Sequence, residues 1–93
     1  MASDFHRPGI EAGLKEYSVP AHLHEGLVQY VLKGITPGGF VTYCLENNFA
    51  EALVRAGGDL SIDDLRAIAK WLWNECPRRA WGSPGIVKTW RGE

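Results

Sequence analysis

From Pro20 onward, the apolar residues of this chain recur at steps of three and four positions, the spacing that places them on one face of an α-helix. The first such stretch covers residues 20–34, where Pro20 suits a first helical position and Gly34 suits a C-terminal stop. No stretch of the sequence shows the strict two-residue alternation of a half-buried strand. The sequence therefore predicts an all-α protein.

A second helix is predicted over residues 37–56, with Thr36 as its N-cap and Pro37 as its first residue. Its apolar residues fall on two different faces. This pattern is typical of a helix that is central in a bundle or held between two subunits.

Two more helices are predicted in the second half of the chain. The first covers residues 61–76, and its Ser61 and Asp64 are spaced for an approximate capping box. The second is short and begins at Pro84, with Ser83 as its N-cap. We therefore expect a small bundle of about four helices joined by short links.

The chain has 93 residues, enough for one domain but few enough that burial is marginal without a partner. We expect the helical domain over residues 20–93 and expect it to form a homo-oligomer. Residues 1–19 contain Pro8, Gly9 and Gly13 and show little periodicity, so we expect an extended or partly ordered N-terminal arm there.

The net charge of −1 hides an uneven distribution. Four basic and nine acidic residues precede Arg66, and six basic and two acidic residues follow from Arg66 onward, giving balances of −5 and +4. So weak an overall charge does not suit non-specific nucleic-acid binding, which requires a broad cationic surface. A local anion site near the C-terminal end remains compatible with it.

The sequence also bears on where the protein acts. No apolar run approaches the roughly 20 residues that span a bilayer, and the N-terminus lacks the pattern of a signal peptide, so we expect a cytoplasmic protein and no membrane partner. Cys44 and Cys76, the only cysteines, each fall in a predicted helix. We expect them to be buried free thiols in a reducing compartment.

Two predicted helices open with similar residues, "TPGGFVTY" from Thr36 and "SPGIVKTW" from Ser83. If Gly38 and Gly39 are both helical, together they cost roughly 2 kcal/mol relative to alanine. Three explanations stay open: close approach of another helix or of Trp81, an irregular entry turn, or an anion site. In the third, bare N–H groups and the helix dipole bind phosphate or carboxylate.

The stretch "PRRAWGSPGIVK" is a second candidate patch. Arg78 and Arg79 offer planar forks to a phosphate, and Trp81 offers a stacking face to a base. The alternative is that Trp81 and Trp90 hold the last helix on the bundle while both arginines are solvated. Together the two patches give these predicted ligand-binding residues: Thr36, Gly38, Gly39, Tyr43, Arg78, Arg79, Trp81, Ser83, Gly85 and Lys88.

No catalytic set is evident in the sequence. His22 and His24 are two residues apart, so on a helix they point in different directions, and neither has a nucleophile in a recognisable context. Asp63 and Asp64 are better explained by the helix dipole than by acid–base chemistry. Cys44, Cys76 and the two histidines lack a diagnostic metal-ligand spacing. We predict no enzyme activity, no metal site and no cofactor.

The segments "GLVQYVLKGITPGGFVTYCLENNFAEAL" and "NECPRRAWGSPGIVKTW" resemble a set of small all-helical proteins encoded by bacteriophages and prophages. The resemblance covers roughly residues 19–91, and its most recognisable part is "WGSP" with the downstream tryptophan. Gly85 departs from the pattern, because such proteins often have a helix-favouring residue there. The resemblance implies a phage setting and expression in the bacterial cytoplasm.

Two functions are compatible with that setting. The first is sequestration of a nucleotide-type immune signal, such as a cyclic dinucleotide, a cyclic oligonucleotide or a cyclic ADP-ribose derivative, in a phage counter-defence role. The second is docking of an apolar helix face on a host or phage protein, as an anti-CRISPR-like inhibitor or a transcription modulator would do. The glycine-opened helices and the arginine patch favour the first.

Overall fold

The elements of the chain are all helical in the computed structural model, which describes residues 6–55 and 61–92. In chain order they are α1 (Arg7–Glu16), the 3₁₀ turn η1 (Ala21–Leu23), α2 (His24–Lys33), α3 (Phe40–Leu45), α4 (Phe49–Arg55), α5 (Ile62–Asn74), the 3₁₀ turn η2 (Arg78–Ala80) and α6 (Pro84–Thr89). No strand occurs within the two described ranges, so the all-α prediction is confirmed for them.

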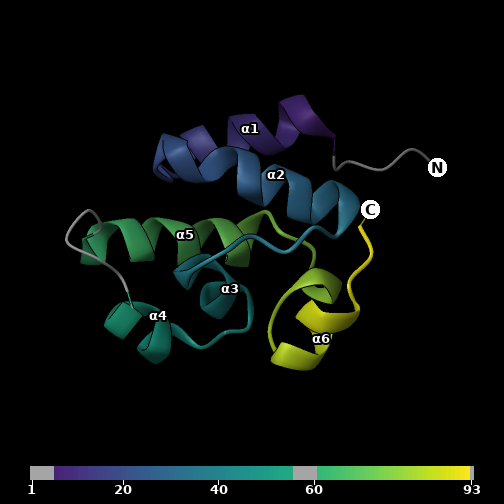
Figure 1. Ribbon diagram of the computed structural model, residues 1–93. Helices are drawn as coiled ribbons and strands as arrows, with labels where there is room; N and C mark the ends of the chain where they lie inside the picture. Colours follow the sequence, from purple (N-terminus) through teal and green to yellow (C-terminus); the bar gives the residue numbers. More distant parts are fainter. Residues whose placement is uncertain (1–5, 56–60, 93) are drawn as a thin grey trace.

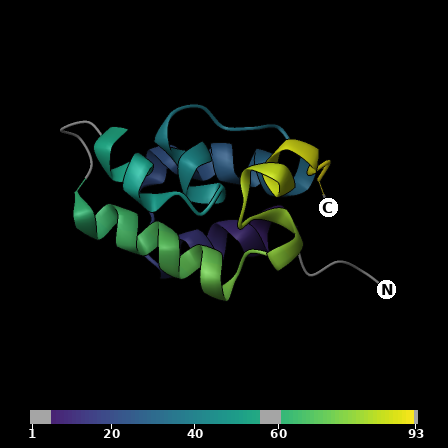
Figure 2. The ribbon, with the colours of Figure 1, turned by 90° about the horizontal axis from the view of Figure 1, so that it is seen from below.

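The longest helix, α5, lies between two groups of helices in the view of Figure 1. Figure 1 shows α1 and α2 side by side on one side of α5, with α3, α4 and α6 on the other. Seen from below, α5 runs along one edge of the molecule (Figure 2). Each of the six helices places at least one apolar residue in a common buried core, which is why none of the short helices has to be stable by itself.

The segment before residue 20 departs from the prediction, because α1 is a helix rather than an extended arm. Pro8 lies in the first turn, where its missing N–H is tolerated. Ile10 and Leu14, one turn apart, are both buried in the core. The expectation of an extended or partly ordered arm is therefore wrong over α1. Residues 1–5, the first part of the predicted arm, lie outside the described ranges.

The single helix predicted over residues 37–56 is divided into α3 and α4. The break falls at Asn47, which has a left-handed φ of 62° that asparagine tolerates better than most residues. Asn48 then accepts a hydrogen bond from the backbone N–H of Glu51 at 3.3 Å, in the manner of an N-cap. Ala56 lies outside the described residues.

Most of the predicted helix ends are confirmed. Gly34 ends α2 with a φ of 72°. Ser61 and Asp64 form the expected capping box on α5, and the Ser83 side chain caps α6. Apart from the bounds of the second predicted helix, two bounds differ: the first predicted helix opens as the 3₁₀ turn η1, and α5 ends at Asn74, two residues before the predicted end.

Tyr30 on α2 connects the two halves of the chain. Its buried hydroxyl donates a hydrogen bond to the carbonyl of Ala80 at 2.5 Å, and its own carbonyl accepts one from Nε1 of Trp90 at 2.8 Å. The backbone N–H of Gly82 also donates to the carbonyl of Leu45 at 2.8 Å. These three bonds fix the segment from η2 to the end of α6 against α2 and α3.

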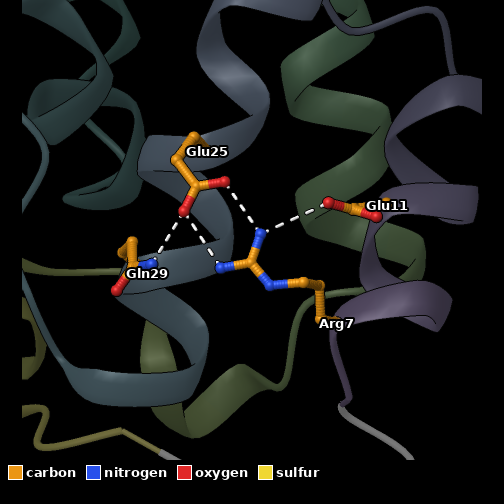
Figure 3. A network of polar contacts seen from close by, with 4 residues as sticks. All are labelled: Arg7, Glu11, Glu25 and Gln29. Atoms are coloured by element: carbon orange, nitrogen blue, oxygen red, sulfur yellow. Dashed lines mark hydrogen bonds and ion pairs between the residues drawn. The ribbon is translucent and has the colours of Figure 1, made fainter.

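A polar network on the surface joins α1 to α2 (Figure 3). The Arg7 guanidinium donates to both carboxylate oxygens of Glu25, at 2.8 and 3.0 Å, and to Glu11 at 3.3 Å. Gln29 donates to Glu25 at 2.7 Å. These bonds to Arg7 and Gln29 lower the pKa of Glu25 from 4.5 to about 2.

Tyr30→Phe tests the buried hydrogen bond. The variant keeps the ring but leaves the Ala80 carbonyl without its donor, so we expect a loss of roughly 1–3 kcal/mol in the free energy of unfolding. Urea titration followed by circular dichroism measures it, with Tyr43→Phe as the matched control on a half-buried ring. Equal, small effects in the two variants would show that the bond contributes little.

The Glu25 network predicts a dependence of stability on pH. Because the folded pKa is depressed, ionised Glu25 stabilises the fold above pH 4.5, and this contribution is lost as pH falls from 4.5 towards 2. Over that interval we expect the thermal midpoint of the wild type to fall more than that of Glu25→Gln. The difference between these two falls in thermal midpoint should be smaller at high salt, because the Arg7–Glu25 ion pair is exposed. Glu16→Gln is the control, and parallel curves for the wild type and Glu25→Gln would contradict the prediction.

Candidate functional site

A cavity of about 480 Å³ opens beside α5, between the α3–α4 turn and η2. Arg66, Lys70 and Trp73 line it from α5, Arg78 lines it from η2, and Trp81 lines it from the following residues. The three α5 residues are three or four positions apart, so they share one face of that helix. The cavity thus combines three cationic side chains with two indole rings.

Arg78 lies close to both indoles of this cavity. Its guanidinium carbon lies 5.0 Å from the ring centroid of Trp73 and 5.5 Å from that of Trp81, both within the range of a cation–π interaction. Trp81 is almost completely buried, whereas Trp73 is 66% exposed. One ring therefore anchors the arginine to the core, and the other offers surface to an incoming group.

The three cations of the cavity form no ion pair with an acid of the described residues. Within residues 6–55 and 61–92, the ion pairs involve Arg7 and Arg55, and neither Arg66, Lys70 nor Arg78 takes part in one. Like charges gathered in a concave surface raise the local positive potential even when the overall charge is near zero. This site can therefore attract an anion.

The glycine-opened start of the predicted second helix differs from expectation. α3 begins at Phe40, and Gly39 is its N-cap, so Thr36 and Pro37 precede the helix and do not cap or start it. A Cβ on Gly38 or Gly39 would meet no atom within 4 Å, which excludes close packing as the reason for these glycines. Gly39 has φ 66° and ψ −148°, a conformation that essentially only glycine adopts. The irregular entry turn is the explanation that fits.

Gly39 and Tyr43 line a second hollow, of about 460 Å³, together with Glu46 and Arg55. The Arg55 guanidinium lies 5.5 Å from the centroid of the Tyr43 ring and is also bonded to Glu51 at 3.2 Å. The acidic Glu46 in this hollow opposes an anion. The amide-based anion site at this helix start stays a prediction, and a helix of six residues has only a short stack of peptide dipoles to support it.

The predicted ligand-binding residues are thus separated. Arg78 and Trp81 come together in the larger cavity, and Gly39 and Tyr43 in the second hollow. Six lie in the lining of neither: Thr36, Gly38, Arg79, Ser83, Gly85 and Lys88. The Ser83 hydroxyl is occupied as a helix cap, accepting from the backbone N–H of Ile86 at 3.2 Å.

Sequence reasoning missed the contribution of α5 to the larger cavity. Arg66, Lys70 and Trp73 belong to it, but none of them was among the predicted site residues. Their spacing on the polar side of the predicted helix was a usable signal. What it could not show is that Pro77 turns the chain so that Arg78 comes back over Trp73.

Other chemistry-bearing groups are poor candidates for a site. Cys44 and Cys76 are free and buried, as predicted, and burial raises the pKa of each thiol to about 12, which leaves it unreactive at neutral pH. The described ranges contain no group of three or more His, Cys, Asp or Glu side chains placed to hold a metal ion. No helix in them is long and apolar enough to cross a membrane.

Comparison of the chain with models of protein families, with curated proteins and with solved structures finds no match.

The two adjacent glycines give a matched test of the entry turn. Gly39→Ala should destabilise the protein by roughly 1–3 kcal/mol, because its backbone conformation is strained for any residue with a Cβ. Gly38→Ala, open to solvent and without the positive φ, should change the free energy of unfolding by no more than about 0.5 kcal/mol. Urea unfolding of both variants distinguishes them, and similar values would refute the strained turn.

Proposed function

We propose that this protein is a non-enzymatic binder of a phosphate-bearing, aromatic small molecule of the nucleotide type. The observation that carries the proposal is the position of Arg78, whose guanidinium lies against both Trp73 and Trp81 at the larger cavity. An arginine packed on two rings has fewer conformations to lose when a phosphate binds it.

The charges of the cavity fit the phosphate part of such a ligand. A guanidinium forms bidentate hydrogen bonds with phosphate oxygens, and Arg66 and Lys70 add two further cations along one face of α5. Because these three cations have no ion pairs with described residues, a phosphate would not have to displace a carboxylate from them.

The exposed ring of the cavity fits the base. Trp73 is 66% exposed although it is a large apolar side chain. Stacking of a nucleobase on such a ring contributes about 1–3 kcal/mol. Asn47 and Asn74 also line the cavity and can exchange hydrogen bonds with the polar edge of a base.

The biological role that we propose is sequestration. The resemblance to small phage and prophage proteins implies expression in the bacterial cytoplasm, and a protein that binds a signal without converting it can act by keeping that signal from its receptor. We therefore propose a counter-defence protein that removes a nucleotide-type immune signal. The candidate signals are cyclic dinucleotides, cyclic oligonucleotides and cyclic ADP-ribose derivatives.

A second candidate function is docking of a host or phage protein, and one observation favours it. Phe49, Leu53, Ile62 and Leu65 line an apolar hollow of about 230 Å³ between α4 and α5. Leu53 is 50% exposed and Ile62 is 71% exposed. Exposed apolar side chains grouped on neighbouring helices are typical of a protein-binding surface.

The nucleotide proposal predicts a thermal shift. A ligand at one hundred times its dissociation constant adds about 2.7 kcal/mol to the free energy of unfolding, which is readily seen as a raised melting temperature. We expect a shift with at least one member of a panel of cyclic dinucleotides, cyclic oligonucleotides and cyclic ADP-ribose derivatives. No shift with any of them would favour the protein-docking function.

Arg78→Ala then tests the site itself by titration calorimetry with the ligand that gives the shift. We expect at least a tenfold loss of affinity, about 1.4 kcal/mol, because the phosphate loses a charged hydrogen-bond donor. Lys15→Ala, on the exposed side of α1, is the matched control and should bind like the wild type. Unchanged binding by Arg78→Ala would reject this cavity as the site.

A further inference from the structure

The outer face of α5 carries a stripe of four residues, of which Ile62, Arg66 and Trp73 are exposed and Ala69 is half-buried. Ile62, Arg66, Ala69 and Trp73 follow one another at steps of three and four positions, so they lie along one line of the helix. At its two ends Ile62 is 71% exposed and Trp73 is 66% exposed. Two large apolar side chains, three turns apart on one helix, are thus open to solvent.

We propose that this stripe pairs with the same stripe of a second copy of the chain, with the two α5 helices antiparallel about a two-fold axis. If the axis passes near the middle of the helix, Ile62 of each copy comes next to Trp73 of the other. Both exposed apolar ends are then covered at once. Ala69, near the centre, has a small side chain that allows the two helices to approach.

Two charges beside the stripe agree with this arrangement, and Arg66 within the stripe comes opposite the small Ala69 of the other copy. Asp63 and Lys70 are seven residues apart, about two helical turns, and both are exposed on the same flank of α5. Their midpoint falls within one residue of the midpoint between Ile62 and Trp73, a difference of about 1.5 Å along the axis. The axis that pairs the apolar ends therefore also brings Asp63 of each copy beside Lys70 of the other.

The same charges oppose the alternative pairings. Parallel α5 helices in register would place Asp63 on Asp63 and Lys70 on Lys70, two like-charge contacts. An unrelated partner protein would have to supply an apolar group at each end and opposite charges in between. A second copy supplies all four of these groups from one helix, and for this reason we choose it as the occupant.

The pairing also bears on the ligand cavity, a consequence that depends on the proposed nucleotide function. Trp73 lines the cavity, so Ile62 of the second copy would lie at its mouth and cover part of its open side. Each of the two sites would then contain a residue from the other subunit. A ligand held there would be better shielded from water than in one copy alone. Because Lys70 would then face Asp63 of the second copy, Arg66 and Arg78 are the cations of the cavity that remain for a phosphate.

Sedimentation equilibrium of the purified chain without ligand tests the pairing. The wild type should sediment at twice the monomer mass. In Lys70→Glu, an acid at position 70 faces Asp63 of the other copy, and in Asp63→Lys, a base at position 63 faces Lys70 of the other copy. Each like-charge contact occurs twice per dimer, so either variant should weaken the dimer about tenfold. The double variant Asp63→Lys with Lys70→Glu restores opposite charges and should recover the dimer. Lys15→Glu on α1 changes the net charge by the same amount and sign as Lys70→Glu and should leave the dimer intact.

Three outcomes would overturn the pairing. They are a monomeric wild type, single variants that dimerise like the wild type, and a double variant as weak as the single ones. Circular dichroism of each variant confirms that its helices are retained. Because no ligand is present, these results are independent of whether the protein binds a nucleotide.

Discussion

Tyr30 forms one buried hydrogen bond through its side chain and one bond through its main chain, and both reach the C-terminal third of the protein. The hydroxyl is bonded to Ala80 and the carbonyl to Trp90, fifty and sixty residues further along. The Tyr30 side chain is completely buried, so an unpaired hydroxyl would be costly there. Tyr30 therefore fixes where the last third of the chain can lie.

That constraint also determines the candidate site. Ala80 ends η2, the same 3₁₀ turn that begins with Arg78, and Trp81 follows directly. The hydrogen bond to the Ala80 carbonyl thus positions two residues of the cavity, Arg78 two positions before it and Trp81 directly after it. Because Arg78 contacts both the buried Trp81 and the exposed Trp73, the arginine is both fixed in place and accessible. A fixed cation beside an open ring is the basis of the proposed binding function.

Local chemistry made much of the fold predictable. Ser61, Asp64, Ser83 and Gly34 each act through neighbours within a few residues, and their roles were read correctly from the sequence. The break at Asn47 could not be predicted because the apolar pattern continues across it. The helix α1 was not predicted because Pro8 and the glycines near it suggest irregular structure.

Longer-range features could be predicted only in part. Arg78 and Trp81 were identified from their residue types. Their meeting with Trp73 depends on the turn at Pro77 and on the distant contact of Tyr30, neither of which leaves a periodic signal in the sequence. The free-energy cost of two adjacent glycines at a helix start is evident from the sequence. The reason for the second glycine, a positive φ at Gly39, is a property of the backbone that only the structure shows.

The four tryptophans allow the proposed binding of a nucleotide at the Arg78 cavity to be tested residue by residue. In a proton–nitrogen NMR titration with a cyclic dinucleotide, the indole signals of Trp73 and Trp81 should shift, and those of Trp71 and Trp90, which do not line the cavity, should stay in place. Assignment by single Trp→Phe variants identifies each signal. Shifts confined to Trp71 and Trp90, or no shift of any indole across the cyclic dinucleotides, cyclic oligonucleotides and cyclic ADP-ribose derivatives, would contradict binding at this cavity.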